Sequence, residues 1–226
     1  MGTDQRTRMG LIVPSTNTVA ETDFWRAAPE GMSVHTSRML IQDTTAEDEK
    51  RMIEESLPGA ARDLATCRPD VVVFSCTSAA AVIGTAGESK MVSELEKTCG
   101  ARIVSTNAAV SKQIAKRGMG RVAVVTPYIE ELTRKIVEGL NFNRIEAPQT
   151  FSMGIVDPFA IADVTSDEII DFTVNQIDPG KVDGIFLSCT NMRGMEVRER
   201  IQTLTGLPVV TSNQAAFDTA VELING

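Results

Sequence analysis

Short apolar runs alternate with longer stretches of helical spacing along the whole chain. Uninterrupted apolar runs bounded by turn residues are typical of buried parallel strands. Such runs lie at residues 9–13, 71–74, 122–125 and 184–187. Between runs, apolar residues recur three or four positions apart, as at Met52, Ile53 and Leu57, which predicts helices. Repeated strand–helix–strand units favour an α/β fold with parallel sheets and helices on both faces.

The same pattern predicts the order of the elements. Strands are expected at residues 9–13, 32–40, 71–74, 102–104, 122–125, 144–153, 184–187 and 208–210. Helices are expected at residues 19–27, 46–65, 91–97, 108–116, 129–140 and 166–177, with two more ending at Leu204 and Ile224. A loop is expected through Asp157-Pro158. The strand at 32–40 has mixed polarity and is expected near a sheet edge.

The second half of the chain repeats the first. Residues 71–78 read VVVFSCTS and residues 184–191 read GIFLSCTN, and two further pairs of segments also correspond. These are 11–14 with 123–126, and 104–107 with 210–213. We therefore expect a duplication: two similar Rossmann-like lobes with parallel sheets, related by a pseudo-twofold axis, and an active site in the cleft between them. The expected lobes are residues 1–117 and 118–211, with the helix at 212–226 free to pack back onto the first.

Composition and charge narrow the functional class. The chain has 226 residues, is 42% hydrophobic and carries a net charge of −8. It has no lysine- or arginine-rich block, so a nucleic-acid surface is not expected, and local donors must hold any anionic ligand. No apolar run is long enough to cross a bilayer and no leader pattern opens the chain. We expect a cytoplasmic protein with no membrane partner that acts on a small molecule.

The cysteines do not have the spacing of a metal site. The chain has four of them, and His35 is the only histidine. Cys67 and Cys99 follow or end amphipathic segments and are expected to be buried or helix-end thiols. No glycine-rich phosphate loop follows the first strand. We therefore expect no metal and no other cofactor.

Cys76 and Cys189 occupy equivalent strand ends, where open α/β sheets place their ligands. A thiol becomes a workable base or nucleophile once its pKa falls below its usual value of about 8.5, which neighbouring N–H groups can cause. Each cysteine precedes a short polar stretch leading into a helix, so free N–H groups are expected around it. The same groups could bind a substrate carboxylate. Two equivalent cysteines favour catalysis over simple burial.

The motifs resemble those of the Asp/Glu racemase superfamily. The similarity rests on the two Ser-Cys-Thr strands, on the opening LIVPSTNT at 11–18 and on Thr126-Pro127-Tyr128, and it extends over essentially the whole chain. The chain most resembles the maleate cis-trans isomerase branch. This resemblance implies two α/β lobes, no cofactor, and maleate converted to fumarate through a covalent adduct. It assigns Cys76 as the nucleophile and Cys189 as the acid/base.

The resemblance also implies substrate-binding residues, although the motifs that assign them are less specific than those of the two cysteines. They follow the cysteines or lie in the two strand-end turns: Asn17, Thr77, Ser78, Tyr128, Thr190 and Asn191. Asn17 could equally cap the helix that follows it, and Tyr128 could simply pack at its turn. The branch usually carries an Asp-Asn pair where this chain has Asp157-Pro158. Proline offers no amide or N–H donor, which leaves open a different small carboxylate as substrate.

Other functions are ordered by the same motifs. A two-base amino-acid or hydantoin racemase would use the same cysteine pair and remains an alternative. A carboxylate-binding protein without turnover is a second alternative, although binding alone needs no thiol. Glutamate racemases carry Cys-Thr-His where this chain has Cys189-Thr190-Asn191, and arylmalonate decarboxylases carry glycine in place of Cys76, so both are disfavoured. The protein is expected to form a homo-oligomer, a dimer or larger.

Overall fold

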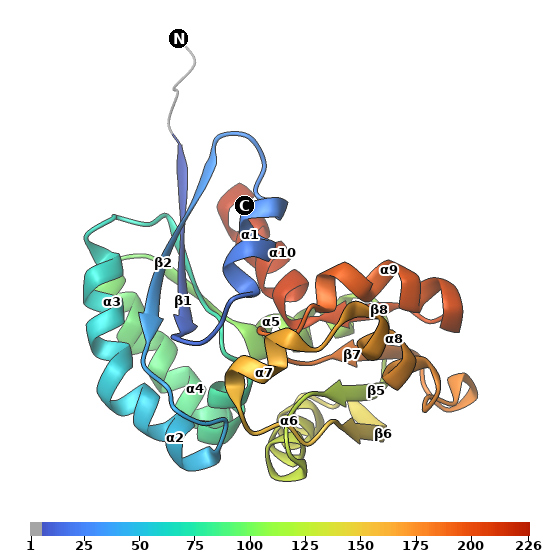
Figure 1. The fold of residues 1–226 in the computed structure, drawn as a ribbon. Helices are drawn as coiled ribbons and strands as arrows, with labels where there is room; N and C mark the ends of the chain where they lie inside the picture. The colour runs from blue at the N-terminus through green and yellow to red at the C-terminus, as the bar shows by residue number, and fades with distance from the viewer. Residues whose placement is uncertain (1–5) are drawn as a thin grey trace.

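The computed structural model describes residues 6–226 and contains two four-stranded, wholly parallel sheets, each flanked by helices (Figure 1). The first has the order β2-β1-β3-β4 and the second the equivalent order β6-β5-β7-β8. The first sheet comprises β1 (Thr7–Pro14), β2 (Met32–Met39), β3 (Val71–Phe74) and β4 (Arg102–Ser105). The second comprises β5 (Arg121–Thr126), β6 (Glu146–Ser152), β7 (Gly184–Leu187) and β8 (Val209–Thr211). The predicted fold of two similar parallel-sheet lobes is confirmed, and β2 lies at a sheet edge as expected.

Helices connect the strands in both lobes. The first half contains α1 (Ala20–Ala27), α2 (Ala46–Arg51), α3 (Leu57–Ala65), α4 (Thr77–Cys99) and α5 (Thr106–Lys116). The second half contains α6 (Glu130–Phe142), α7 (Pro158–Asp163), α8 (Ser166–Val174), α9 (Gly194–Thr205) and α10 (Ser212–Asn225). None of the helices in residues 6–226 is both long enough and apolar enough to cross a membrane.

Three helical segments differ from the sequence prediction. The helix expected at 46–65 is an unbroken run of helical residues but contains a π-helical turn at Met52–Ser56, just before Pro58, which has no N–H for a regular helical bond. Helix α4 starts at Thr77, directly after the first cysteine, and is broken at Gly84, where φ is 67°. The loop expected through Asp157-Pro158 is instead the start of helix α7, because Asp157 accepts the Phe159 N–H and proline suits a first turn.

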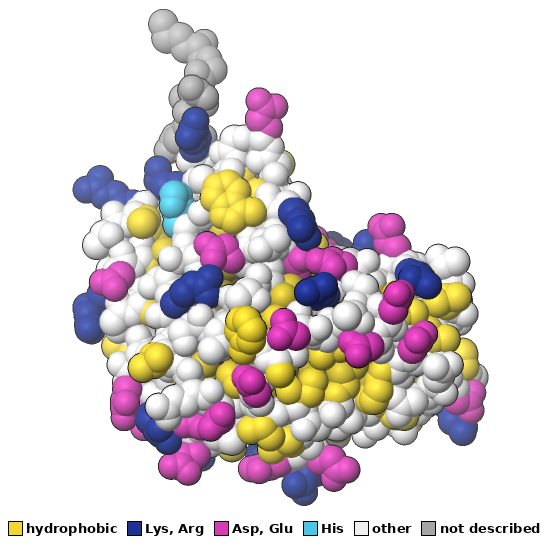
Figure 2. Space-filling view, viewed as in Figure 1, with side chains coloured by type: hydrophobic (Ala, Val, Ile, Leu, Met, Phe, Trp, Pro, Cys, Tyr) yellow, Lys and Arg dark blue, Asp and Glu magenta, His cyan; other side chains and the backbone are white. Residues whose placement is uncertain are grey.

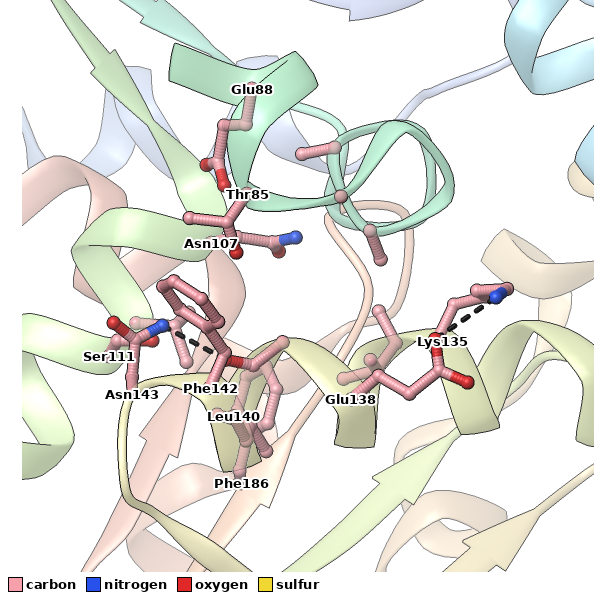
Figure 3. Close-up of a pocket in the computed structure, with 16 residues that line it drawn as sticks. Thr85, Glu88, Asn107, Ser111, Lys135, Glu138, Leu140, Phe142, Asn143 and Phe186 are labelled. Carbon is pink, nitrogen blue, oxygen red and sulfur yellow. Dashed lines mark hydrogen bonds and ion pairs between the residues drawn. The ribbon is translucent and has the colours of Figure 1, made fainter.

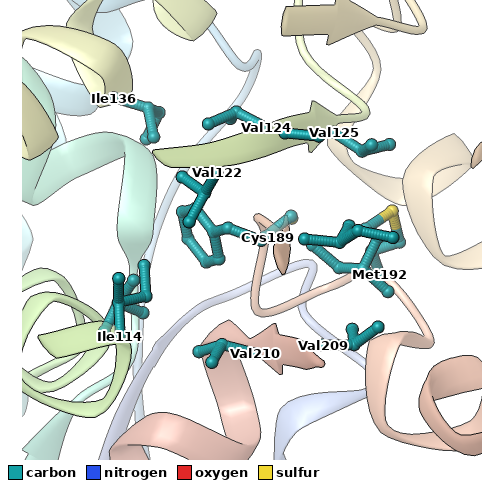
Figure 4. Close-up of a cluster of buried hydrophobic side chains, with 14 of the residues drawn as sticks. Ile114, Val122, Val124, Val125, Ile136, Cys189, Met192, Val209 and Val210 are labelled. Atoms are coloured by element: carbon teal, nitrogen blue, oxygen red, sulfur yellow. The ribbon is translucent and has the colours of Figure 1, made fainter. Parts of the chain in front are cut away.

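The inner strands are buried on both faces, which explains why they read as continuous apolar runs. In the second lobe, Val124 and Val125 pack with Met192 in a cluster that also contains Cys189 (Figure 4). Cys189, which follows the end of strand β7, is therefore part of the hydrophobic core of the second lobe. A rigid core behind a strand end holds a side chain in a fixed position.

Helix α10 returns from the second lobe to pack on the first. Ala216, Phe217 and Ala220 belong to the same buried cluster as Leu11 and Phe24 of the first lobe. The rings of Phe24 and Phe217 meet edge to face with centroids 5.4 Å apart. The two ends of the chain thus share one core.

Candidate active site

The strand ends bring the two predicted cysteines to one small cavity. Strands β3 and β7 end two residues before Cys76 and Cys189, and both side chains line a cavity of about 30 Å³, roughly the room of two water molecules. The other lining residues are Pro14, Thr16, Asn17, Ile41, Thr44, Glu49, Ser78, Tyr128, Pro158, Ile161, Thr190 and Asn191. Every site residue predicted from the sequence lies among them except Thr77. The Thr77 hydroxyl points to the Ser212 hydroxyl at 3.0 Å instead.

Cys76 sits beside a buried carboxylate that the sequence analysis did not identify. Its thiol donates to Glu49 Oε2 at 3.4 Å, and its sulfur lies 3.6 Å from the Ser78 hydroxyl oxygen. Ser78 in turn donates to the other carboxylate oxygen of Glu49. Glu49 comes from helix α2 and is only 1% exposed. Cys76, Ser78 and Glu49 are thus each in polar contact with the other two.

Burial governs the protonation of this group. It raises the pKa of the Cys76 thiol well above its usual value, and the charge of Glu49 raises it further, whereas the Ala79 N–H and the Ser78 hydroxyl lower it. Burial also raises the pKa of Glu49 to about 7, against the hydrogen bonds from Ser78 and Cys76. The expectation that N–H groups lower the cysteine pKa overall is wrong, because burial of the thiol outweighs them. The resting form of Cys76 is the thiol.

Cys189 is held by a different set of contacts. Its φ of 123° lies in a region that residues other than glycine rarely adopt. Its N–H donates to the Ser212 hydroxyl at 3.0 Å, and its sulfur accepts the Asn191 N–H at 3.2 Å. Burial raises the pKa of Cys189 to about 11, while the Tyr128 hydroxyl and the N–H groups of Asn191 and Met192 lower it. Like Cys76, it rests as a thiol.

Asn17 joins the two lobes at the floor of the cavity. Its Oδ1 accepts the N–H groups of Val19 and Ala20 at 3.1 and 2.9 Å, so it caps the start of α1 as the sequence suggested. Its Nδ2 donates to the Thr190 hydroxyl at 3.0 Å. That hydroxyl donates to the carbonyl oxygen of Ser75 at 3.1 Å. One amide therefore fixes the loop after the second cysteine against the first lobe.

Helix α7 forms one wall of the cavity. Pro158 and Ile161 line the cavity, whereas Phe159 is 53% exposed on the outer face. Asn191 binds this wall through Nδ2, which donates to the Pro158 carbonyl at 2.8 Å. Figure 1 shows α7 between the two lobes, and Figure 2 shows hydrophobic side chains gathered across the same face. Pro158 has no amide side chain to offer a substrate, but it contributes an apolar surface to the cavity and a carbonyl that accepts the hydrogen bond from Asn191.

The cavity carries no positive charge. None of its lining residues is lysine, arginine or histidine, and Glu49 is its only carboxylate. Thr16 adds a buried hydroxyl for which no hydrogen-bond partner is found among residues 6–226. Sequence analysis missed both residues. A carboxylate that lies three positions before Met52, on the buried stripe of its helix, was the available signal for Glu49.

A larger cavity of about 160 Å³ lies elsewhere, between α4, α5 and α6 (Figure 3). Glu88 and Lys135 are among the residues that line it, and it contains neither cysteine nor any other predicted site residue. Cys67 is exposed and Cys99 is buried at the end of α4, and both lie outside the smaller cavity. Within residues 6–226, no group of three or more histidine, cysteine or acidic side chains is placed to hold a metal ion.

Fold and site together define a class: two α/β lobes that each present one strand-end cysteine to a shared cavity. The sequence model of the arylmalonate decarboxylase family matches residues 9–226. The chain therefore belongs to the family of arylmalonate decarboxylases and maleate isomerases, within the Asp/Glu racemase superfamily.

Individual relatives come from both branches of that family. A maleate isomerase of Geobacillus stearothermophilus is 29% identical, over 91% of this chain and 86% of the relative. An arylmalonate decarboxylase of Bordetella bronchiseptica is 26% identical, over 96% of this chain and 90% of the relative. A crystal structure of a maleate isomerase variant from Pseudomonas putida S16 with maleate superposes with a TM-score of 0.91 at 25% identity. That match covers 97% of this chain and 92% of the other.

Proposed function

We propose that this enzyme is a cofactor-independent isomerase of a small carboxylate, and that its reaction is the cis-trans isomerisation of maleate, or a close analogue, to fumarate. The observation that supports this most strongly is the pair of buried cysteines on one cavity. Arylmalonate decarboxylases, by the resemblance described above, lack the first of these cysteines. The relatives named maleate isomerase support the same choice.

In the proposed reaction, Cys76 sulfur adds to one alkene carbon and Cys189 gives a proton to the other. The former double bond is then single, so the adduct rotates about it. Cys189 takes a proton back from the carbon, the carbon–sulfur bond breaks, and fumarate leaves. Splitting one difficult step into two in this way is the usual advantage of a covalent intermediate. Tyr128 supports Cys189 because its hydroxyl lowers the pKa of that thiol.

Neutral donors are proposed to hold the substrate carboxylates. The Thr16 hydroxyl is without a partner in the described chain, and helix α4 begins at the cavity with N–H groups that favour an anion. A four-carbon dicarboxylate is larger than the present cavity, so we expect a wall to move when it binds. Helix α7 is the wall with an exposed outer face.

A two-base racemase is the second candidate, because it would use the same thiols on opposite sides of one carbon. It differs in its products and its proton exchange. Racemisation must exchange the carbon-bound hydrogen with solvent, whereas isomerisation through an adduct need not. The NMR spectrum of substrates incubated with the protein in D2O therefore separates the two, and maleate converted to fumarate supports the isomerase.

Intact-protein mass spectrometry tests the roles of the two cysteines. Cys189→Ser should accumulate an adduct of maleate mass, since Cys76 can still add while water supplies the carbon proton, whereas the removal of that proton for elimination is impaired. Cys76→Ser should form none, because serine provides no comparable anion near neutral pH. The isomerase proposal fails if maleate is left unconverted by the unsubstituted protein and no adduct appears on any form.

A further inference from the structure

Glu49 is a buried carboxylate with no cationic partner among residues 6–226. It is 1% exposed, and no lysine, arginine or histidine lies among the residues that line its cavity. Its hydrogen-bond donors within the described chain are the Cys76 thiol and the Ser78 hydroxyl, one to each oxygen. An unpaired buried carboxylate is costly, so a protein that keeps one has placed it at the expense of stability. Because Glu49 lies against the proposed nucleophile Cys76, a role in catalysis would explain why the carboxylate is buried there.

Two oxygens lie within hydrogen-bond distance of the Cys76 sulfur, Glu49 Oε2 and the Ser78 hydroxyl. The thiol donates to Glu49 Oε2, while the neighbouring Ser78 hydroxyl already directs its own proton to Glu49 Oε1. Cys189 and Tyr128, the other titratable groups in the cavity, are proton donors at neutral pH because burial raises both pKa values. Asp48, next to Glu49 on the same helix, is bound to Arg51 at 2.9 Å. Among residues 6–226, Glu49 is therefore the group in hydrogen-bond contact with the thiol that can take and keep its proton.

We propose that Glu49 is a catalytic residue, the base that accepts the proton of Cys76 as its sulfur attacks the substrate. The inference rests on the proposed function and adds the residue that activates the nucleophile. The S–H bond of Cys76 breaks and its proton bonds to Glu49 Oε2. The sulfur electron pair forms the carbon–sulfur bond, the alkene electron pair moves to the adjacent carbon, and Cys189 delivers its proton there. Elimination reverses each step, so Glu49 returns its proton to Cys76.

Charge provides the physical reason for this transfer. Before addition, one negative charge is buried on the Glu49 carboxylate. After addition, Glu49 is a neutral acid, and it can donate to the adduct sulfur while Ser78 remains bound to its other oxygen. The negative charge then resides on the Cys189 sulfur, which has given its proton to the carbon, so no protein carboxylate faces those of a dianionic substrate. The cost of burying the carboxylate charge makes Glu49 a stronger proton acceptor than an exposed glutamate.

Infrared difference spectroscopy detects this proton directly. The Cys189→Ser protein is treated with maleate at about pH 8, where Glu49, with a pKa of about 7, is mostly ionised before the reaction. We expect the carbonyl band of a protonated carboxylic acid to appear together with the adduct. The band should be lost in Cys189→Ser/Glu49→Gln and retained in Cys189→Ser/Glu47→Gln, because Glu47 is exposed on the same helix. An adduct without the band, or a band that persists without Glu49, overturns the proposal.

Two further measurements keep the test independent of folding and of maleate turnover. Carboxyl-¹³C glutamate, incorporated into the Cys189→Ser protein, should shift the band, and an unshifted band contradicts the assignment even if the Glu49→Gln form does not fold. Iodoacetate labels Cys76 with an anionic group whether or not the protein isomerises maleate. If iodoacetate produces the band but maleate gives no adduct, Glu49 is the base and the isomerase proposal fails alone.

The kinetic consequence is a loss of turnover rather than of binding. Glu49→Gln should lower kcat/KM for maleate by about 10² or more, the usual contribution of a general base. KM should not rise, because the substitution removes a negative charge from the cavity. Glu49→Asp should recover part of the rate, and Glu47→Gln should be unchanged. An unchanged kcat in Glu49→Gln would contradict the proposal.

Discussion

The two lobes share one strand order, yet each holds its cysteine in a different way. Cys76 has extended backbone and is followed at once by α4, so its sulfur lies at a helix N-terminus. Cys189 has a φ of 123° and is followed by a turn before α9 begins at Gly194. In that turn the Asn191 N–H folds back onto the sulfur. The same Ser-Cys-Thr sequence therefore ends in two backbone geometries, decided by the residues after it.

The neighbours of the two thiols differ more than their backbones. Glu49 lies against Cys76 and has a pKa of about 7, whereas Tyr128 influences Cys189 and has a pKa raised well above its usual value. One neighbour can accept a proton near neutral pH and the other can only donate a hydrogen bond. The duplicated fold provides two equivalent positions, and unrelated neighbours give them different chemical roles. The predictions below test that difference.

The first prediction concerns the cost of the Glu49 charge in the first lobe. Burial raises its pKa from 4.5 to about 7, so between these values the folded protein keeps a proton that the unfolded chain has released. The stabilisation from this group is complete below pH 4.5 and is lost as pH rises through 7, a change on the order of 3 kcal/mol. Glu49→Gln should lack this loss. Urea unfolding at about pH 5 and pH 8 measures it.

A matched variant separates this effect from that of another buried acid. Burial also raises the pKa of Asp23, to about 6, although Asn213 donates to it at 2.7 Å. The pH dependence that remains in Glu49→Gln should therefore belong largely to Asp23 and decrease in Glu49→Gln/Asp23→Asn. Equal pH dependence in Glu49→Gln and the unsubstituted protein would show that Glu49 is not buried as an anion.

The second prediction concerns the hydroxyl in the second lobe. Tyr128→Phe removes a group that lowers the Cys189 pKa, so that pKa should rise above about 11. A hydrogen bond to a charged group contributes about 1.5–3 kcal/mol, so kcat for maleate should fall about 10- to 100-fold. Iodoacetate labelling of Cys189 in a Cys76→Ser background, followed against pH, reports the pKa. Equal slowing of Cys76 labelling in the reciprocal background would mean that the hydroxyl serves both thiols.

The smallest expected effect concerns helix α7, which follows edge strand β6 as α2 follows edge strand β2 in the first lobe. Asp157→Ala removes the side chain that caps it and should cost about 1 kcal/mol of stability. Because α7 lines the cavity, KM for maleate should rise while kcat changes little. Thr165→Ala, which uncaps helix α8 outside the cavity lining, is the matched control. It should lower stability similarly and leave KM unchanged, so a KM increase in both variants would argue against a role for α7 in binding.

Most of the fold could be predicted because parallel strands buried on both faces are recognisable as apolar runs. The strand-end cysteines could be predicted for the same reason, since each directly follows such a run. Helix α7 could not be recognised by periodicity, because six residues span too few turns. Its Asp157-Pro158 start was nevertheless a capping signal.

Glu49 shows what sequence patterns leave out. Residues 46–49 resemble the acidic first turn of any surface helix, a common and favourable arrangement. The spacing of Glu49 from Met52 indicates that it faces inward, but only the approach of α2 to the end of β3 places it against Cys76, and that approach depends on contacts between segments far apart in the chain. The same contacts decide the thiol pKa values, because burial depends on every element around the cavity.

The return of α10 to the first lobe has a consequence for synthesis. Phe217 and Ala220 complete the cluster around Phe24 and Leu11, yet they belong to α10, which follows the last strand of the second lobe. A ribosome releases the first lobe well before it makes that helix, so the nascent lobe keeps part of its apolar surface uncovered during translation. Its final folding must wait for helix α10. Truncation there would leave the earliest part of the chain exposed to chaperones and proteases.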